Sequence, residues 1–83
     1  MQQDEIRQLV LEILYEIAPE LREQVIEPDL NFRDQFDFDS VDFLNFVLSL
    51  EKKLKLKLPE LDYPKLSSLN GCLAYLASRS ESA

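Results

Sequence analysis

Histidine and tryptophan are absent from this chain, and cysteine and glycine each occur only once. Without histidine, the chain lacks the commonest general base and the commonest metal ligand of proteins. The single cysteine, Cys72, excludes an internal disulfide and fits a reducing compartment. We therefore expect a cytoplasmic protein.

Long apolar runs are also absent. No stretch approaches the roughly 18 consecutive apolar residues that indicate a membrane span. The first five residues, Met1 to Glu5, lack the basic and apolar regions of a signal peptide. With 83 residues, the chain is expected to form a single domain, residues 1–83, with a small core.

Charge is unevenly distributed along the chain, which has a net charge of −7. Residues 1–42 hold twelve acidic and three basic side chains, whereas residues 43–83 hold four acidic and six basic ones. The acidic half should repel nucleic acid and attract basic protein surfaces. The simpler alternative is that the acidity only keeps a small protein in solution.

Apolar residues recur with helical spacing near the start of the chain: Ile6, Leu9, Val10, Ile13, Leu14 and Ile17. This stripe predicts an amphipathic helix over residues 3–17, ended by Pro19. Residues 18–38 are expected to form a long connection, with a short turn at 21–24. In that connection, Phe32 and Phe36 are expected to anchor the loop on the core.

A second helix is predicted over residues 40–54, and its apolar residues occupy more than one stripe. It should therefore be buried on most sides or line a cavity. Residues 54–58 alternate between apolar and basic side chains, which by period alone indicates a strand, but an isolated strand is not stable. They are therefore expected to be the fraying end of the helix followed by an extended segment that stops at Pro59.

The remainder of the chain predicts a short helix near residues 62–66 and a last helix capped by Ser67 or Ser68. Its apolar stripe is Leu69, Cys72, Leu73 and Leu76. A glycine costs a helix roughly 1 kcal/mol relative to alanine, so Gly71 suggests close packing. Cys72 is expected to be a buried, inert thiol. The fold class is therefore all-α: a small bundle of three main helices and one short helix.

The segment from Asp37 to Leu44 places one serine between aspartates at the start of the second helix. Asp39 is suited to be the N-cap, with Asp42 completing a variant of the capping box. Ser40 then lies in the first turn, near free backbone N–H groups and the positive end of the helix dipole. Such a position favours a phosphate.

Two catalytic or metal-binding interpretations of this segment are weaker. A nucleophilic Ser40 would need an adjacent base, and the chain has no histidine, while the lysines of this helix lie several turns away. A calcium loop starting at Asp37 would need an acid or amide at position 5 and glutamate at position 12. Those positions hold Val41 and Leu48, so we predict neither a catalytic residue nor a metal site.

Asp39-Ser40-Val41, followed by Leu44, Val47 and Leu48, resembles the Asp-Ser-Leu motif of acyl carrier proteins. The resemblance covers nearly the whole chain: a first helix, a long loop, the motif helix, a Leu-Pro-bearing loop and a last helix. The chain departs from the motif at Val41, where leucine is commoner, and at Asp37, where glycine often stands.

The resemblance implies that Ser40 carries 4′-phosphopantetheine, placed there by a partner transferase acting with Mg²⁺ and coenzyme A. The thiol of that arm would hold acyl intermediates as thioesters for fatty-acid, polyketide or related biosynthesis. The protein itself would not be an enzyme, and we expect a monomer. Its other partners would be acyltransferases, ligases or synthases that dock on the motif helix.

The resemblance also assigns partner recognition to Asp37, Asp39, Val41 and Asp42. Because Phe38, Phe43 and Phe46 crowd the region where relatives hold acyl chains, we expect a small or closed cavity for cargo. The alternative is that these rings are ordinary core residues, shifted aside to leave a normal pocket. Other functions remain open: an aminoacyl, D-alanyl or peptidyl carrier, an unmodified acidic helical adaptor, or a small acidic inhibitor or regulatory subunit.

Overall fold

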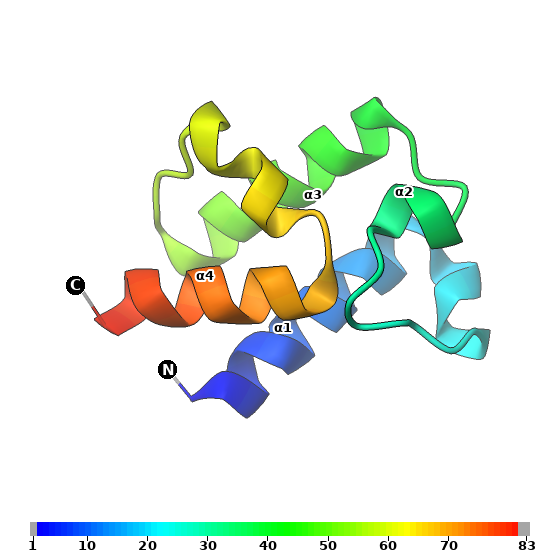
Figure 1. Ribbon diagram of the computed structural model, residues 1–83, viewed down its shortest axis with the longest axis horizontal. Helices are drawn as coiled ribbons and strands as arrows, with labels where there is room; N and C mark the ends of the chain where they lie inside the picture. The colour runs from blue at the N-terminus through cyan, green and yellow to red at the C-terminus, as the bar shows by residue number, and fades with distance from the viewer. Residues whose placement is uncertain (1, 82–83) are drawn as a thin grey trace.

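The computed structural model describes residues 2–81, and over this range its regular structure is entirely helical (Figure 1). Its elements are α1 (Gln3–Ile17), the 3₁₀ helix η1 (Pro19–Glu23), α2 (Phe32–Gln35), α3 (Ser40–Leu54), the 3₁₀ helix η2 (Glu60–Leu66) and α4 (Leu69–Glu81). The predicted all-α class is confirmed. The number of short helices is larger than expected, because the long connection contains two of its own.

The long helix α1 contacts both α3 and α4, so it holds the bundle together (Figure 1). It has the predicted bounds, and four residues of its apolar stripe are buried: Ile6, Val10, Ile13 and Leu14. The shared core draws on every helix and on two connecting segments: Ile6, Val10, Ile13, Leu14, Leu21, Phe32, Phe38, Phe46, Val47, Leu50, Leu58, Leu66, Leu69, Cys72, Leu73 and Leu76. Burial of this apolar surface is the main force that holds a domain of this size together.

In the connection between α1 and α3, side chains make hydrogen bonds to backbone groups that have no partner in a regular helix. The amide of Gln35 donates to the carbonyl oxygens of Glu27 and Leu30, at 2.9 and 2.8 Å, and accepts from the Glu27 N–H. Phe32 N–H donates to the carbonyl oxygen of Ser67, at 2.8 Å, and the Phe32 ring is buried. The short helix α2 is therefore fixed against the segment before α4. The expected turn at 21–24 overlaps η1, which begins at Pro19 and ends at Glu23. The expected anchoring role of Phe32 is confirmed.

Helix α4 begins at Leu69, close to the end of η2 and two residues before the chain's single glycine, Gly71. The hydroxyl of Ser68 accepts a hydrogen bond from Gly71 N–H at 3.1 Å, so Ser68 is the cap of the two serines considered. A Cβ added to Gly71 would lie 2.5 Å from the carbonyl oxygen of Lys65. The predicted close packing at Gly71 is therefore confirmed, and it brings η2 against the first turn of α4.

The C-terminal end of α3 is held by polar contacts. Lys55 ends the helix in the left-handed conformation, with φ of 56°, and residues 56–58 have no regular secondary structure. Arg79 of α4 donates to the carbonyl oxygen of Lys57 at 2.8 Å and to the Tyr75 hydroxyl at 2.8 Å. The Tyr75 hydroxyl donates in turn to the carboxylate of Asp62 in η2, at 2.5 Å. We call Asp62, Tyr75 and Arg79 the polar clamp, because they join α4 to η2 and to the end of the α3–η2 connection.

Candidate functional site

Ser40 is the first residue of α3, and its side chain is exposed. The Asp39 carboxylate accepts a hydrogen bond from Asp42 N–H at 2.9 Å, and the Asp42 carboxylate accepts one from Asp39 N–H at 3.3 Å. This is the predicted capping box, with both acids turned to the backbone. Among the residues that the structure describes, none makes a hydrogen bond to the Ser40 hydroxyl, so that hydroxyl is available for reaction.

The chain's five phenylalanines gather beneath this end of α3. The Phe32 ring lies at the centre of the cluster, with ring centroids 6.2 Å from Phe36, 5.8 Å from Phe38 and 5.6 Å from Phe46. Phe43 extends the cluster, with its centroid 6.3 Å from Phe46 and 6.0 Å from the ring of Tyr63 in η2. The edge-to-face geometry at several of these contacts is the favoured one for aromatic pairs. The rings thus connect α2, α3 and η2.

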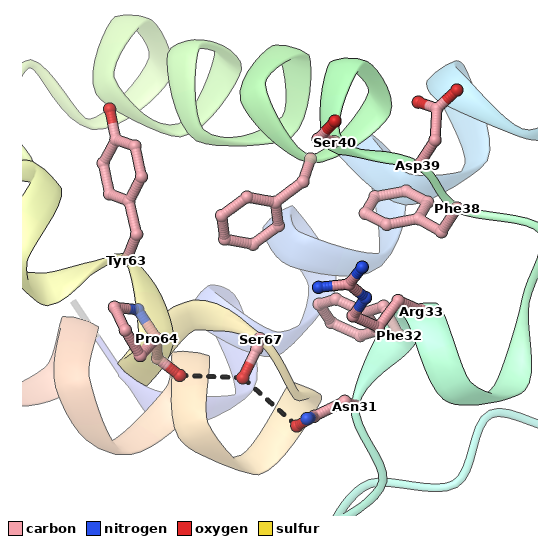
Figure 2. A pocket seen from close by; sticks show the side chains of 10 residues that line it. Asn31, Phe32, Arg33, Phe38, Asp39, Ser40, Tyr63, Pro64 and Ser67 are labelled. Carbon is pink, nitrogen blue, oxygen red and sulfur yellow. Dashed lines mark hydrogen bonds between the residues drawn. The ribbon is translucent and has the colours of Figure 1, made fainter.

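A cleft of about 360 Å³ lies next to Ser40, between α2, the start of α3 and η2 (Figure 2). Its lining residues are Asn31, Phe32, Arg33, Phe38, Asp39, Ser40, Phe43, Tyr63, Pro64 and Ser67. Aromatic rings form much of the wall, and the hydroxyl of Ser67, 2.7 Å from the Pro64 carbonyl oxygen, marks a polar edge (Figure 2). The volume is at the lower end of the range typical of small-molecule sites, about 300–1,000 Å³.

The sequence predicted a small or closed cavity, and the cavity beside Ser40 is small but not closed by the three rings. Phe46 is fully buried in the core rather than directed into the cleft. Phe38 and Phe43 do line the cleft, but they form its wall and leave the space beside it open. The reason is that Phe46 packs against the ring of Phe32, which draws it toward α2 and the core.

One face of α3 is apolar and exposed. Val41, Leu44 and Leu48 have 64%, 45% and 49% of their surfaces accessible. Only Phe46, Val47 and Leu50 of this helix are buried. Of the two predictions for this helix, burial on most sides does not hold, whereas the lining of a cavity does, through Ser40 and Phe43. The pattern of apolar residues could not distinguish a covered face from an uncovered one.

The four residues expected to recognise partners lie around the start of α3. Asp37 and Val41 are exposed, while Asp39 and Asp42 hold each other's backbone N–H groups in the capping box. Leu44 and Leu48, which we did not assign to recognition from the sequence, are exposed on the same helix. No group of three or more acids or cysteines within residues 2–81 is placed to hold a metal ion.

Arg33 is the basic residue of the cleft, and sequence reasoning missed it along with Asn31, Tyr63, Pro64 and Ser67. It lies on α2 and is exposed, and Figure 2 shows its guanidinium directed into the cleft, below the ring of Phe38. No ion pair or hydrogen bond joins Arg33 to any other described residue. Its position depends on α2, a single helical turn that no periodic pattern in the sequence could reveal.

Cys72 lies in the core as predicted, and burial raises the pKa of its thiol far above the usual range. Its Sγ contacts the carbonyl oxygen of Leu66 at 3.2 Å. Since the thiolate is the reactive form of cysteine, Cys72 is not suited to carry cargo.

The comparisons with known proteins agree with this arrangement. Residues 4–76 match the family described as "Phosphopantetheine attachment site". The class of the protein is thus a carrier domain of the kind that presents a phosphopantetheine arm. Acyl carrier proteins of Lactobacillus johnsonii and Renibacterium salmoninarum are 36% and 30% identical over 53 and 62 residues, or 64% and 75% of this chain. The acyl carrier protein of Acidothermus cellulolyticus is 25% identical over all 83 residues.

The chain belongs to the acyl carrier protein family. The matched stretches span 66%, 72% and 98% of the relatives from L. johnsonii, R. salmoninarum and A. cellulolyticus. Members of this family are generally carriers rather than catalysts. No helix in residues 2–81 combines the length and the apolar character needed to cross a membrane.

Proposed function

We propose that Ser40 is the residue that carries 4′-phosphopantetheine, and that the protein delivers acyl thioesters between partner enzymes. The single observation that carries this proposal is an exposed Ser40 hydroxyl at the first position of α3, beside an aromatic cleft. The family match, which includes residue 40, supports it. Modification of Ser40, the origin of the arm in coenzyme A and the pathway served are parts of this proposal.

The residues around Ser40 fit a phosphate ester. The backbone N–H groups of Ser40 and Val41 lie in the first turn, where donors have no partner within the helix. The helix dipole adds partial positive charge there, which offsets the negative charge of Asp37, Asp39 and Asp42. The capping box holds the two acids nearest Ser40 on the backbone, so that they leave its hydroxyl free.

The chemistry at Ser40 would be done by a transferase. The Ser40 oxygen would bond to the phosphorus that bears pantetheine, the diphosphate of coenzyme A would break, and adenosine 3′,5′-bisphosphate would leave as the hydroxyl proton is lost. When bound, the arm supplies a thiol that forms thioesters. This chain provides the attachment point and the docking surface, and a flexible tether raises the concentration of cargo at each docked enzyme.

Partner enzymes are expected to dock on the exposed face of α3, through Val41, Leu44 and Leu48, with Asp37 beside it. Contacts to the acids should weaken with salt, because exposed charges are screened within about 8–10 Å at physiological ionic strength. Towards its C-terminal end α3 carries Lys52 and Lys53, so we expect fewer partners than an acidic motif helix would serve. A cytoplasmic location and a monomeric state complete the proposal.

Intact-mass measurement tests the assignment of Ser40. The chain is incubated with a broad-specificity phosphopantetheinyl transferase, Mg²⁺ and coenzyme A. The wild type should gain one phosphopantetheine, and Ser40→Ala should gain none while keeping its helical content. Ser49→Ala, on the same helix, is the matched control and should be modified as fully as the wild type.

A modified Ser40→Ala variant would show that another residue carries the arm. An unmodified wild type would favour the second function, an acidic adaptor that binds partners through α3 without an arm. That alternative has an observation of its own, because the exposed apolar face of α3 does not depend on Ser40.

A further inference from the structure

We propose that Arg33 binds a negatively charged group at the end of the cargo, so that the class of cargo is a short acyl chain with a terminal carboxylate. This inference rests on the proposed attachment at Ser40 and specifies what the arm carries. It begins from a cation in the cleft that the attachment itself does not require.

Arg33 is available for such a contact. It is one of only three basic residues among the first 42, which include twelve acids, and yet it has no ion pair with any described residue. Arg22, by contrast, stacks on the ring of Tyr15, with its guanidinium carbon 4.9 Å from the centroid. The Asp39 carboxylate also borders the cleft, but it is bound to Asp42 N–H and points away from Arg33 (Figure 2).

The backbone beneath Arg33 is held in place, so the guanidinium is presented to the cleft from a fixed attachment point. The neighbouring Phe32 is buried in the core, and its N–H is bonded to Ser67. On the other side, Gln35 makes three hydrogen bonds to the preceding loop. A helix of one turn is thus fixed by tertiary contacts on both sides of Arg33, so that little backbone ordering is needed when a ligand binds.

The chemistry of the cleft selects among cargoes. A guanidinium presents paired N–H donors that match a carboxylate. The rings of Phe38, Phe43 and Tyr63 offer apolar contact to a few methylene groups between thioester and carboxylate. A terminal ammonium would be repelled by Arg33, and a long alkyl chain would have to pass the charged group in a cleft of about 360 Å³.

The test uses three forms of arm on Ser40: pantetheine alone, glutaryl-pantetheine, and the neutral terminal amide of the glutaryl group. Each is attached from the corresponding coenzyme A derivative, and intact mass is checked before melting temperatures are measured at low ionic strength. In the wild type, the glutaryl form should melt about 2–4 °C above the amide form, the effect of one exposed charge pair in a domain of this size.

Variants assign that difference to Arg33. Arg33→Gln should abolish it, Arg33→Lys should keep part of it, and Arg7→Gln, which removes the same charge from α1 outside the cleft, should keep all of it. Melting of each unmodified variant is measured as well, and any shift found there is subtracted as a structural effect of the substitution.

The outcomes separate the two proposals. If the wild type gains no mass, attachment at Ser40 is wrong, and this inference falls with it. If mass is gained but the glutaryl and amide forms melt alike, or if their difference survives in Arg33→Gln, attachment stands and the assignment of cargo is wrong. If Arg33→Gln lowers the melting temperature of the pantetheine form as much as that of the glutaryl form, the anion bound by Arg33 is the phosphate of the arm. That result also overturns the carboxylate assignment.

Discussion

The two ends of α3 are held in different ways. At the Ser40 end, the contacts to α2 and η2 are made by aromatic rings, which accept both offset-stacked and edge-to-face arrangements over centroid distances of about 4.5–7 Å. At the Leu54 end, the polar clamp and a hydrogen bond from Leu58 N–H to the Glu51 carboxylate, at 2.8 Å, hold the following segment. Hydrogen bonds weaken steeply when their geometry changes. The Ser40 end can therefore adjust to what enters the cleft, while the other end keeps η2 attached.

Among changes at the two ends of α3, removing a ring from the aromatic cluster should lower the stability of the protein most. Phe46→Ala deletes a fully buried side chain that touches Phe32, Phe38 and Phe43. We expect a loss of about 3–5 kcal/mol in the free energy of unfolding, measured by urea denaturation. Leu48→Ala, on the exposed face of the same helix, is the control and should change stability by about 0.5 kcal/mol or less. Similar losses in the two variants would contradict the central role given to the rings.

Weakening the polar clamp should have a smaller effect. Tyr75→Phe removes the hydroxyl that donates to Asp62 and accepts from Arg79. Hydrogen bonds to charged groups contribute about 1.5–3 kcal/mol, and the clamp is only partly buried, so we expect a loss near the lower value. Tyr15→Phe removes a hydroxyl with no hydrogen bond to a described residue and should be nearly neutral. Equal effects would show that the clamp does not stabilise η2.

The same tyrosine gives the clamp a pH dependence. Burial raises the pKa of Tyr75 above its usual value, and its hydrogen bond to Asp62 acts in the same direction. A raised pKa in the folded state means that the stabilisation is complete below the pKa of the unfolded chain, about 10, and is lost as pH rises through the folded value. The difference in stability between wild type and Tyr75→Phe should therefore shrink above about pH 10. A constant difference across that range would exclude this link.

The cap at the Ser40 end should make the smallest contribution. Asp39→Ala removes the carboxylate that accepts from Asp42 N–H, which should cost about 1 kcal/mol. Asp37→Ala is the matched control, because it removes a neighbouring exposed acid that has no hydrogen bond to a described residue. Thermal melting of both variants makes the comparison. A loss in Asp37→Ala as large as in Asp39→Ala would mean that charge near the helix start, rather than the cap, is what matters.

The features that the sequence predicted well depend on residues that are close to one another along the chain. The bounds of α1 and α3 and the Asp39–Asp42 capping box follow from periodicity and local hydrogen bonding, whereas the sequence left the cap of α4 open between Ser67 and Ser68. The close approach at Gly71 followed from the cost of glycine in a helix. The exposed position of Ser40 in the first turn of α3 was predicted in the same way, from its place after an N-cap.

The features that the sequence could not predict depend on distant partners. Helix α2 is too short for periodicity and exists because Phe32 binds Ser67 and stacks in the ring cluster. The polar clamp joins Asp62, Tyr75 and Arg79 across two helices, and nothing local marks those residues as partners. Arg33 enters the cleft only because α2 forms, so the cation of the candidate site was missed along with its helix.

The position of Tyr63 has a spectroscopic consequence. The chain has no tryptophan and three tyrosines, so excitation at wavelengths where tyrosine but not phenylalanine absorbs gives emission from those three side chains alone. Tyr63 borders the cleft, with its ring against Phe43, whereas Tyr15 and Tyr75 do not line it. A Tyr15→Phe, Tyr75→Phe double variant would leave one fluorophore at the mouth of the cleft. Entry of cargo could then be followed as a change in intensity of the protein's own signal, with no attached dye.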